Sequence, residues 1–210
     1  MEGPVARPLA AALCGLLLAG VGAGCTSRSA TPESRSQRST ATATSSATAA
    51  PPSVPLRVQV THVAGRLSAQ QRRAVAGGVR RSLASYVDGA FLGGHYPRSD
   101  FSAAFRVFTA GAAPAARRDR ALLTNRPLGA TTAAVRAVHR TAYLSVLSPG
   151  GHVSGVTAAV DLVFAVDRGR EAARKVHLKG RMLLTRGPKG RWAVFGYDLS
   201  RSQTAARSAS

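Results

Sequence analysis

The apolar residues of this 210-residue chain change their spacing near residue 131. Between Ser68 and Ala90 they recur every three or four positions, which is typical of a helix that buries one side. Beyond Thr131 they alternate with polar residues, which is the period of a strand with one buried face. Helices followed by strands predict an α+β domain, in which helices pack on an antiparallel sheet of about four strands.

The first helix carries a start signal and an unusual interior. Ser68 and Gln71 fit a capping box, in which each side chain bonds the backbone N–H of the other residue. Gly77 and Gly78 would each cost about 1 kcal/mol relative to Ala in a helix interior. We therefore expect them to mark a kink or a close approach to the sheet.

Shorter helices are expected before the sheet begins. Ser99 or Asp100 is suited to cap a second helix, and Pro114 is suited to begin a third. The third should continue through Leu123 and stop at 125–127, where a proline follows two polar residues.

Four segments carry the strand pattern, at 131–147, 153–166, 175–185 and 191–200, and a weaker one at 57–63 is compatible with an edge strand. The segment 175–185 alternates most clearly. Its apolar residues share one face, and the other face carries Lys175, His177, Lys179 and Arg181. We predict that these four residues form a basic contact face on the solvent side of the sheet.

This order of elements, with the closing segment Arg-Trp-Ala-Val-Phe-Gly-Tyr-Asp-Leu at 191–199, resembles the nuclear transport factor 2-like fold. In that family a long helix and two shorter ones pack into the concave face of a curved sheet. Its exported actinobacterial members include proteins associated with mammalian-cell-entry transport systems. The resemblance covers most of the folded domain and implies a cone-shaped α+β structure.

The first 24 residues have the pattern of a signal peptide. Arg7 precedes a thirteen-residue apolar run at 9–21, which is too short to span a bilayer as a helix. The run ends in Gly-Ala-Gly directly before Cys25, which resembles the bacterial lipobox. That resemblance implies a diacylglycerol on the Cys25 sulfur and an extracytoplasmic protein anchored to the cell membrane. The alternative is ordinary cleavage, which would give a freely secreted protein.

Composition sets the remaining boundaries of the domain. Residues 25–54 are rich in Ser, Thr, Ala and Pro, so they cannot bury enough apolar surface to fold, and we expect a disordered tether. The folded domain is predicted at 55–201, and 202–210 is predicted to be a disordered tail. Both cysteines lie before residue 26, which leaves the domain without a disulfide or a thiolate metal site. The scattered histidines indicate no metal, and no cofactor is predicted.

A net charge of +20 favours polyanionic partners, unless it reflects only an arginine-rich composition. Export disfavours nucleic acid, so we expect an acidic envelope protein or anionic lipid. A homodimer through the sheet is a further expectation. These partners predict a non-enzymatic, membrane-tethered accessory or interaction module of the cell envelope.

The alternative function is a small apolar-ligand binder or a ketosteroid-isomerase-like enzyme. The family resemblance implies that Asp161 could act as a base inside the cone, whereas the simpler interpretation points it outward to pair with Lys179 or Arg181. The aromatic residues Phe91, Phe105, Phe108, Tyr143 and Trp192 could line a ligand pocket or simply form the core.

The lipobox interpretation predicts the mass of the mature amino terminus. Mass spectrometry should find acyl chains on Cys25, because the Cys sulfur and the new amino group are the acceptors that the resemblance implies. Cys25→Ala should abolish acylation and release the chain from membranes. A mature terminus without acyl chains would contradict the prediction.

Overall fold

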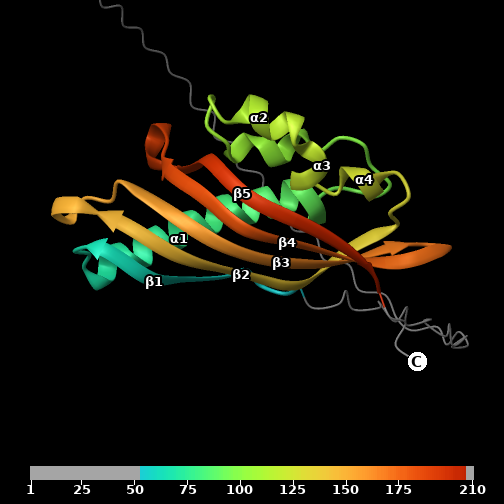
Figure 1. Ribbon diagram of the computed structural model, residues 1–210, viewed down its shortest axis with the longest axis horizontal. Coiled ribbons are helices and arrows are strands. Elements are labelled where there is room, and N and C mark those ends of the chain that lie inside the picture. The colour runs from blue at the N-terminus through green and yellow to red at the C-terminus, as the bar shows by residue number, and fades with distance from the viewer. Residues whose placement is uncertain (1–52, 207–210) are drawn as a thin grey trace, which may run out of the picture. The chain divides into compact units, whose positions relative to one another are not determined.

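The computed structural model describes residues 53–206, so the predicted signal peptide, Cys25 and most of the predicted tether lie outside the described residues. Within this range five strands form one sheet in the order β1-β2-β3-β4-β5 (Figure 1). Their bounds are Arg57–Gly65, Ala134–Ser148, Gly155–Arg168, Glu171–Arg186 and Trp192–Ala205. The domain is therefore α+β, as predicted.

The sheet is mixed rather than antiparallel. β1 runs parallel to β2, whereas β2 to β5 form an antiparallel meander. A parallel pair needs a long crossover, and here the whole helical segment between β1 and β2 supplies it. The predicted count of about four strands was one short, but the weak segment at 57–63 that was compatible with an edge strand does form the edge strand β1. Its alternation is weak because β1 has no fully buried residue and a register shift between Val60 and His62.

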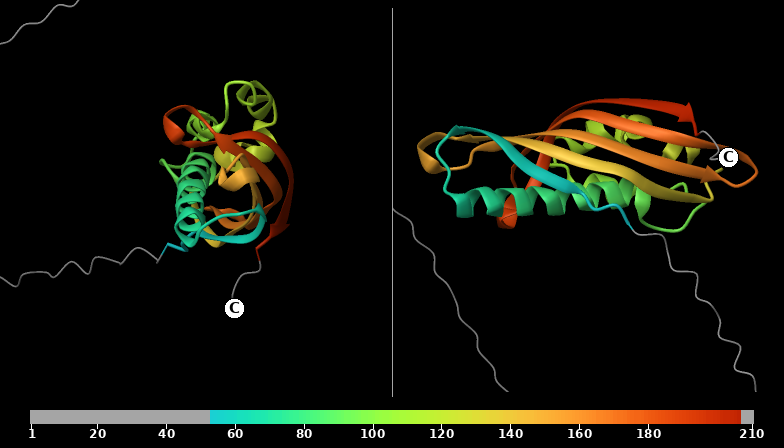
Figure 2. Two further views of the ribbon diagram at one scale, coloured as in Figure 1. Left: turned by 90° about the vertical axis from the view of Figure 1, so that its left-hand side faces the viewer. Right: turned by 90° about the horizontal axis from the view of Figure 1, so that it is seen from below.

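The long helix α1 (Ala69–Val87) continues into one π-helical turn, η1 (Asp88–Leu92). The predicted capping box is confirmed. The Gln71 N–H donates to the Ser68 hydroxyl at 3.1 Å, and the Ser68 N–H donates to the Gln71 side-chain oxygen at 2.8 Å. The helix lies along one face of the sheet (Figure 2). It buries Val75, Val79, Leu83, Tyr86 and Val87 there.

Short helices fill the rest of the crossover: η2 (Ser102–Val107), α2 (Ala113–Arg118), α3 (Arg120–Leu123) and α4 (Arg126–Gly129). The third predicted helix is thus interrupted at Asp119, which has a non-helical ψ of 20°. Its carboxylate accepts a hydrogen bond from the Tyr197 hydroxyl of β5 at 2.6 Å. This contact with a distant strand explains why local helix preference did not show the break.

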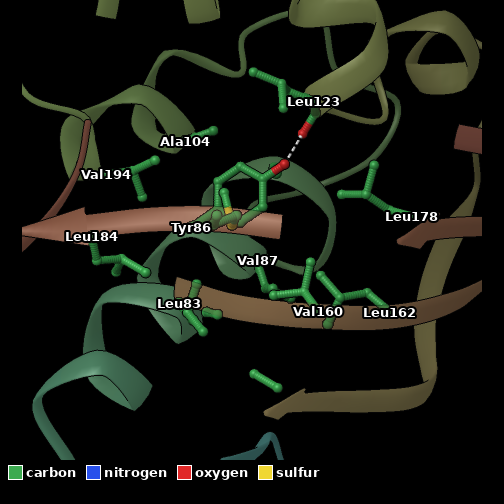
Figure 3. Packing of buried hydrophobic residues seen from close by; sticks show 14 of the residues in the cluster. Leu83, Tyr86, Val87, Ala104, Leu123, Val160, Leu162, Leu178, Leu184 and Val194 are labelled. Carbon is green, nitrogen blue, oxygen red and sulfur yellow. Dashed lines mark hydrogen bonds between the residues drawn. The ribbon is translucent and has the colours of Figure 1, made fainter. Parts of the chain in front are cut away.

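One apolar core lies between α1 and the inner face of the sheet. The ring of Phe91 stacks on that of Phe164 from β3, with centroids 4.3 Å apart and an interplanar angle of 9°. The buried Tyr86 hydroxyl donates to the Leu123 carbonyl at 2.6 Å (Figure 3). Burial raises the pKa of Tyr86 above its ordinary value, so the phenol stays neutral and keeps donating.

β5 also extends past the predicted end of the domain at Arg201. Residues as far as Ala205 pair with β4, as in the pairs of Thr204 with Lys175 and Ala205 with Arg174. Polar, exposed residues give no hydrophobic alternation, so backbone hydrogen bonding alone defines this part of the strand. The prediction of a disordered tail from 202 was wrong for 202–205.

The two glycines of α1 have different roles. A Cβ on Gly78 would lie 2.6 Å from Cδ1 and 2.7 Å from Nε1 of the Trp192 ring, so only glycine lets the helix approach the start of β5 this closely. A Cβ on Gly77 would meet nothing closer than the end of the Arg81 side chain, at 3.8 Å. The predicted close approach to the sheet is confirmed at Gly78 and does not involve Gly77.

These neighbours provide a matched pair of substitutions. Gly78→Ala should lower the free energy of unfolding by about 1–3 kcal/mol, because it overpacks the contact with Trp192. Gly77→Ala should raise it by about 0.5–1 kcal/mol, because Ala restricts the unfolded chain and favours helix. Urea unfolding measures both, and equal effects of the two variants would contradict the packing described here.

Candidate functional site

The outer face of the sheet, away from α1, carries the predicted basic residues. On β4 the apolar residues Val176, Leu178, Met182 and Leu184 are buried in the core. The residues between them point the other way. Lys175, Lys179 and Arg181 are exposed, and His177 is half-buried. The alternation on β4 therefore has the two faces that its sequence predicted.

Asp161 of β3 lies on this same outer face. Its neighbours Val160 and Leu162 are buried, so the two-residue period turns Asp161 to solvent. Its side chain is 51% exposed and one carboxylate oxygen lies 2.9 Å from Nε2 of His177. The interpretation of Asp161 as a base inside the cone is therefore wrong in this structure. The expected partners Lys179 and Arg181 are also replaced, because Asp161 reaches diagonally across to His177.

Apolar side chains lie beside the cations. Tyr143 of β2 is 50% exposed, and in the sheet register it is opposite Ala159 of β3, which is opposite Arg181 of β4. Val163 and Leu183 on the same face are only partly buried. We call the set Tyr143, Ala159, Lys175, Lys179 and Arg181 the outer sheet face. It joins an apolar strip on β2 and β3 to a row of positive charges on β4.

Among the described residues, the positive charges of the outer sheet face form no ion pair, although Asp161 is opposite Lys179 in the register. In the part of the chain that the structure describes there are two ion pairs, Arg168 with Glu171 and His177 with Asp161. Asp198 of β5 is opposite Arg181 in the register, yet these two residues do not form an ion pair. Lys175, Lys179 and Arg181 are therefore available to an external anion.

The predicted aromatic pocket is mostly core. Phe91, Phe105, Phe108 and Trp192 are buried, and the Phe108 ring makes edge contacts with Tyr86 and Tyr197 at centroid distances of 6.1 and 5.8 Å. Tyr143 points out of the domain, so it cannot line the same space. Its alternation with Ala142 and Leu144, both fully buried, could have placed it outside from the sequence.

Sequence reasoning missed two open hollows on the helical side. One, of about 390 Å³, is lined by Ser99, Asp100, Phe101, Phe105, Arg117, Arg120 and Arg126. A second, of about 670 Å³, includes Arg81, Arg98, Arg106, Asp88 and Asp100 in its lining. The arginines of each hollow come from separate elements. Only the run 117–120, where three arginines lie close together in the sequence, could have indicated a basic site.

Asp100 lines both hollows, and its carboxylate is hydrogen-bonded to Ser102 in the turn that follows it. One carboxylate oxygen accepts from the Ser102 N–H at 2.8 Å, and the other accepts from the Ser102 hydroxyl at 3.1 Å. The backbone hydrogen bond, followed by the hydroxyl, lowers the pKa of Asp100. The residue thus stays ionised and fixes the start of η2.

Two other polar groups hold β5 against the short helices. Arg201 donates to the backbone oxygens of Thr124 and Ala121, and burial lowers its pKa to about 10. Burial, followed by the hydrogen bond to Asp119, raises the pKa of Tyr197 to about 12. Both side chains face the helices rather than the outer sheet face, so we assign them a structural role.

Within 53–206 no three His, Cys, Asp or Glu side chains gather as metal ligands. None of the described helices combines the length and the hydropathy needed to cross a bilayer.

The position of Asp161 predicts a small energetic role. Asp161→Asn should lower the free energy of unfolding by no more than about 1 kcal/mol, because exposed ion pairs contribute little. The adjacent inward substitution Leu162→Ala should cost about 2–5 kcal/mol, since it leaves a cavity in the core. Chemical denaturation compares the two variants, and a large loss for Asp161→Asn would contradict the outward placement.

Comparisons with known proteins add no assignment to this geometry. Neither the models of protein families, nor curated proteins, nor solved structures gave a significant match to the chain.

Proposed function

We propose that this chain is a non-enzymatic, membrane-tethered accessory or interaction module of the cell envelope, and that its outer sheet face binds an acidic protein. The observation that carries the proposal is the row of exposed cations on β4, which forms no ion pair among the described residues. Association of oppositely charged surfaces would pair these cations and guide the encounter.

The spacing of the row fits a regular acidic surface. Outward residues on a strand repeat every two positions, or about 7 Å, so Lys175 to Arg181 spans about 20 Å. Lys179 and Arg181 are one repeat apart, within the screening length of about 8 Å at physiological salt, so their charges reinforce each other. Lys175 is two repeats from Lys179, with His177 between them, and so acts as a separate charge at the end of the row. An acidic strand or helix placed along β4 would meet all three cations at once.

The neighbouring apolar strip favours a protein over a lipid surface. Protein interfaces combine a partly apolar centre with polar edges, and they are enriched in Tyr and Arg. Tyr143, Ala159 and Arg181 lie in one cross-strand row that offers this combination. Anionic lipid headgroups would attract the cations and could accommodate Tyr143, but they would not require the fixed cross-strand order of Tyr143, Ala159 and Arg181.

The predicted anchor at Cys25 supports the same function. A tether holds the domain close to any partner in the same membrane, so a modest affinity suffices for binding. Self-association is less favourable, because two outer sheet faces would bring like charges together. Dimerisation through the sheet stays a prediction, and light scattering of the purified chain tests it.

We also propose that the domain belongs to the nuclear transport factor 2-like fold. Support comes from a long helix along one sheet face, short helices after it, and a closing antiparallel meander. The ligand-binding and isomerase alternatives are not favoured. Their proposed base faces solvent, and Phe91, Phe108 and Trp192 pack into the core. Tyr143 is exposed, and Phe105, although buried, lines an open hollow rather than an enclosed cavity.

Charge reversal tests the function directly. The variant Lys175→Glu/Lys179→Glu/Arg181→Glu should bind polyglutamate, used as an acidic polypeptide probe, at least about tenfold more weakly than the wild type, because it removes the facing charges. The matched control reverses Arg72, Arg73 and Arg80, which are exposed on α1. Fluorescence anisotropy with labelled polyglutamate measures both.

Two outcomes would contradict the proposal. Equal losses in the two triple variants would show that net charge alone drives binding. Preferential binding to phosphatidylcholine vesicles containing phosphatidylglycerol, without binding to polyglutamate, would favour a lipid surface instead. A photo-crosslinker at Ala159 adds a cellular readout. We expect a discrete adduct with an acidic protein in the wild type, and no adduct in the sheet variant Lys175→Glu/Lys179→Glu/Arg181→Glu.

A further inference from the structure

We propose that the hollow lined by Arg117, Arg120 and Arg126 binds a phosphate monoester group. This site goes beyond the proposed function of the outer sheet face. The hollow is formed by residues 99–126, within the crossover between α1 and β2, and no residue of the outer sheet face lines it. Its volume of about 390 Å³ lies in the lower part of the range for small-molecule sites, about 300–1,000 Å³.

Three arginines line the hollow, and they come from three different helices, α2, α3 and α4. A guanidinium presents its N–H groups as a rigid planar fork, which matches pairs of oxygens on phosphate or carboxylate. Approach from three elements suits a tetrahedral group with several outward oxygens better than a planar carboxylate. A phosphate monoester, which carries up to two negative charges at neutral pH, complements the three cations.

The three arginines are exposed, and no ion pair among the described residues neutralises them. Nη1 of Arg126 donates to the Ser99 carbonyl and Nη1 of Arg120 donates to the Arg117 carbonyl, both at 3.4 Å. Neither of the two ion pairs in residues 53–206 includes Arg117, Arg120 or Arg126. These long backbone contacts leave most N–H donors of the guanidinium groups for a ligand.

The apolar lining strengthens the attraction. The rings of Phe101 and Phe105 are largely buried and contribute to the wall of the hollow. The hollow is open and its three arginines are exposed, so these rings reduce the screening of charge only along the wall that they form. Asp100 opposes an anion, although its oxygens already accept hydrogen bonds from Ser102. The site is therefore basic overall with one fixed negative charge at its edge.

Calorimetry with inorganic phosphate tests the site on the full chain, at constant ionic strength with chloride as the balancing anion. The variant Arg117→Gln/Arg120→Gln/Arg126→Gln should lower phosphate affinity about tenfold or more, because it removes the charge-assisted donors. The matched control Arg72→Gln/Arg73→Gln/Arg80→Gln removes the same charge from the exposed face of α1 and should change the affinity less than about twofold.

A second substitution keeps every arginine and guards against a folding defect. Asp100→Asn should tighten phosphate binding, because it removes a repulsive charge while its side-chain oxygen can still accept from Ser102. The sheet variant at Lys175, Lys179 and Arg181 should leave phosphate affinity unchanged. A failure of this site is thereby distinguishable from a failure of the outer sheet face.

Vesicles distinguish the source of the phosphate. Phosphatidylcholine vesicles with phosphatidic acid present a monoester, whereas those with phosphatidylglycerol present a diester. Arginine-dependent binding to inorganic phosphate supports a soluble ligand, and arginine-dependent preference for phosphatidic acid supports a lipid headgroup. The proposal would be overturned if neither inorganic phosphate nor phosphatidic acid bound. Equal losses of affinity in the two arginine variants, or no gain of phosphate affinity in Asp100→Asn, would also overturn it.

Discussion

The packing of α1 against the inner face of the sheet is the constraint on which the other features depend. It requires a glycine where the helix meets Trp192, because any Cβ at Gly78 would overlap the indole ring. It also places Phe91 flat against Phe164 and orients the Tyr86 hydroxyl toward Leu123. With the inner face of β3 and β4 covered in this way, the alternate side chains must point to the opposite side of the sheet. The residues of the outer sheet face are thus those that alternate with the core residues along each strand.

Features set by short-range periodicity were predicted well from the sequence. Ser68 and Gln71 indicated the start of α1, and the two-residue alternation of β4 correctly assigned Lys175 and its neighbours to solvent. Features set by contacts across the fold were missed. The helix is interrupted at Asp119, whose carboxylate is bound by Tyr197 from β5. Asp161 pairs with His177, its diagonal neighbour, rather than with Lys179, which is directly opposite in the register. Nothing near these residues in the sequence identifies their partners.

The arginine hollow illustrates the same limit for sites. In the sequence, Arg126 lies beside a proline, which indicates a helix boundary. Arg117 and Arg120 have the spacing of a solvent-exposed helix side. Only the turns between α2, α3 and α4 bring them to one concavity with Phe101 and Phe105. Tyr143 was misjudged for a different reason. Its aromatic ring suggested core, although the period of β2 already turned it outward between Ala142 and Leu144.

The distribution of charge then separates two kinds of recognition. On the outer sheet face the cations are mostly lysines in a straight row, which suits an extended surface and tolerates variation in the partner. In the hollow the cations are all arginines on different helices, which suits a compact group of defined geometry. The two sets lie on different layers of the domain and share no residue. If both proposals hold, the domain has a protein-binding face on its sheet and a separate phosphate site on its helical side. Because the two sets of residues do not overlap, occupation of one site would not cover the other.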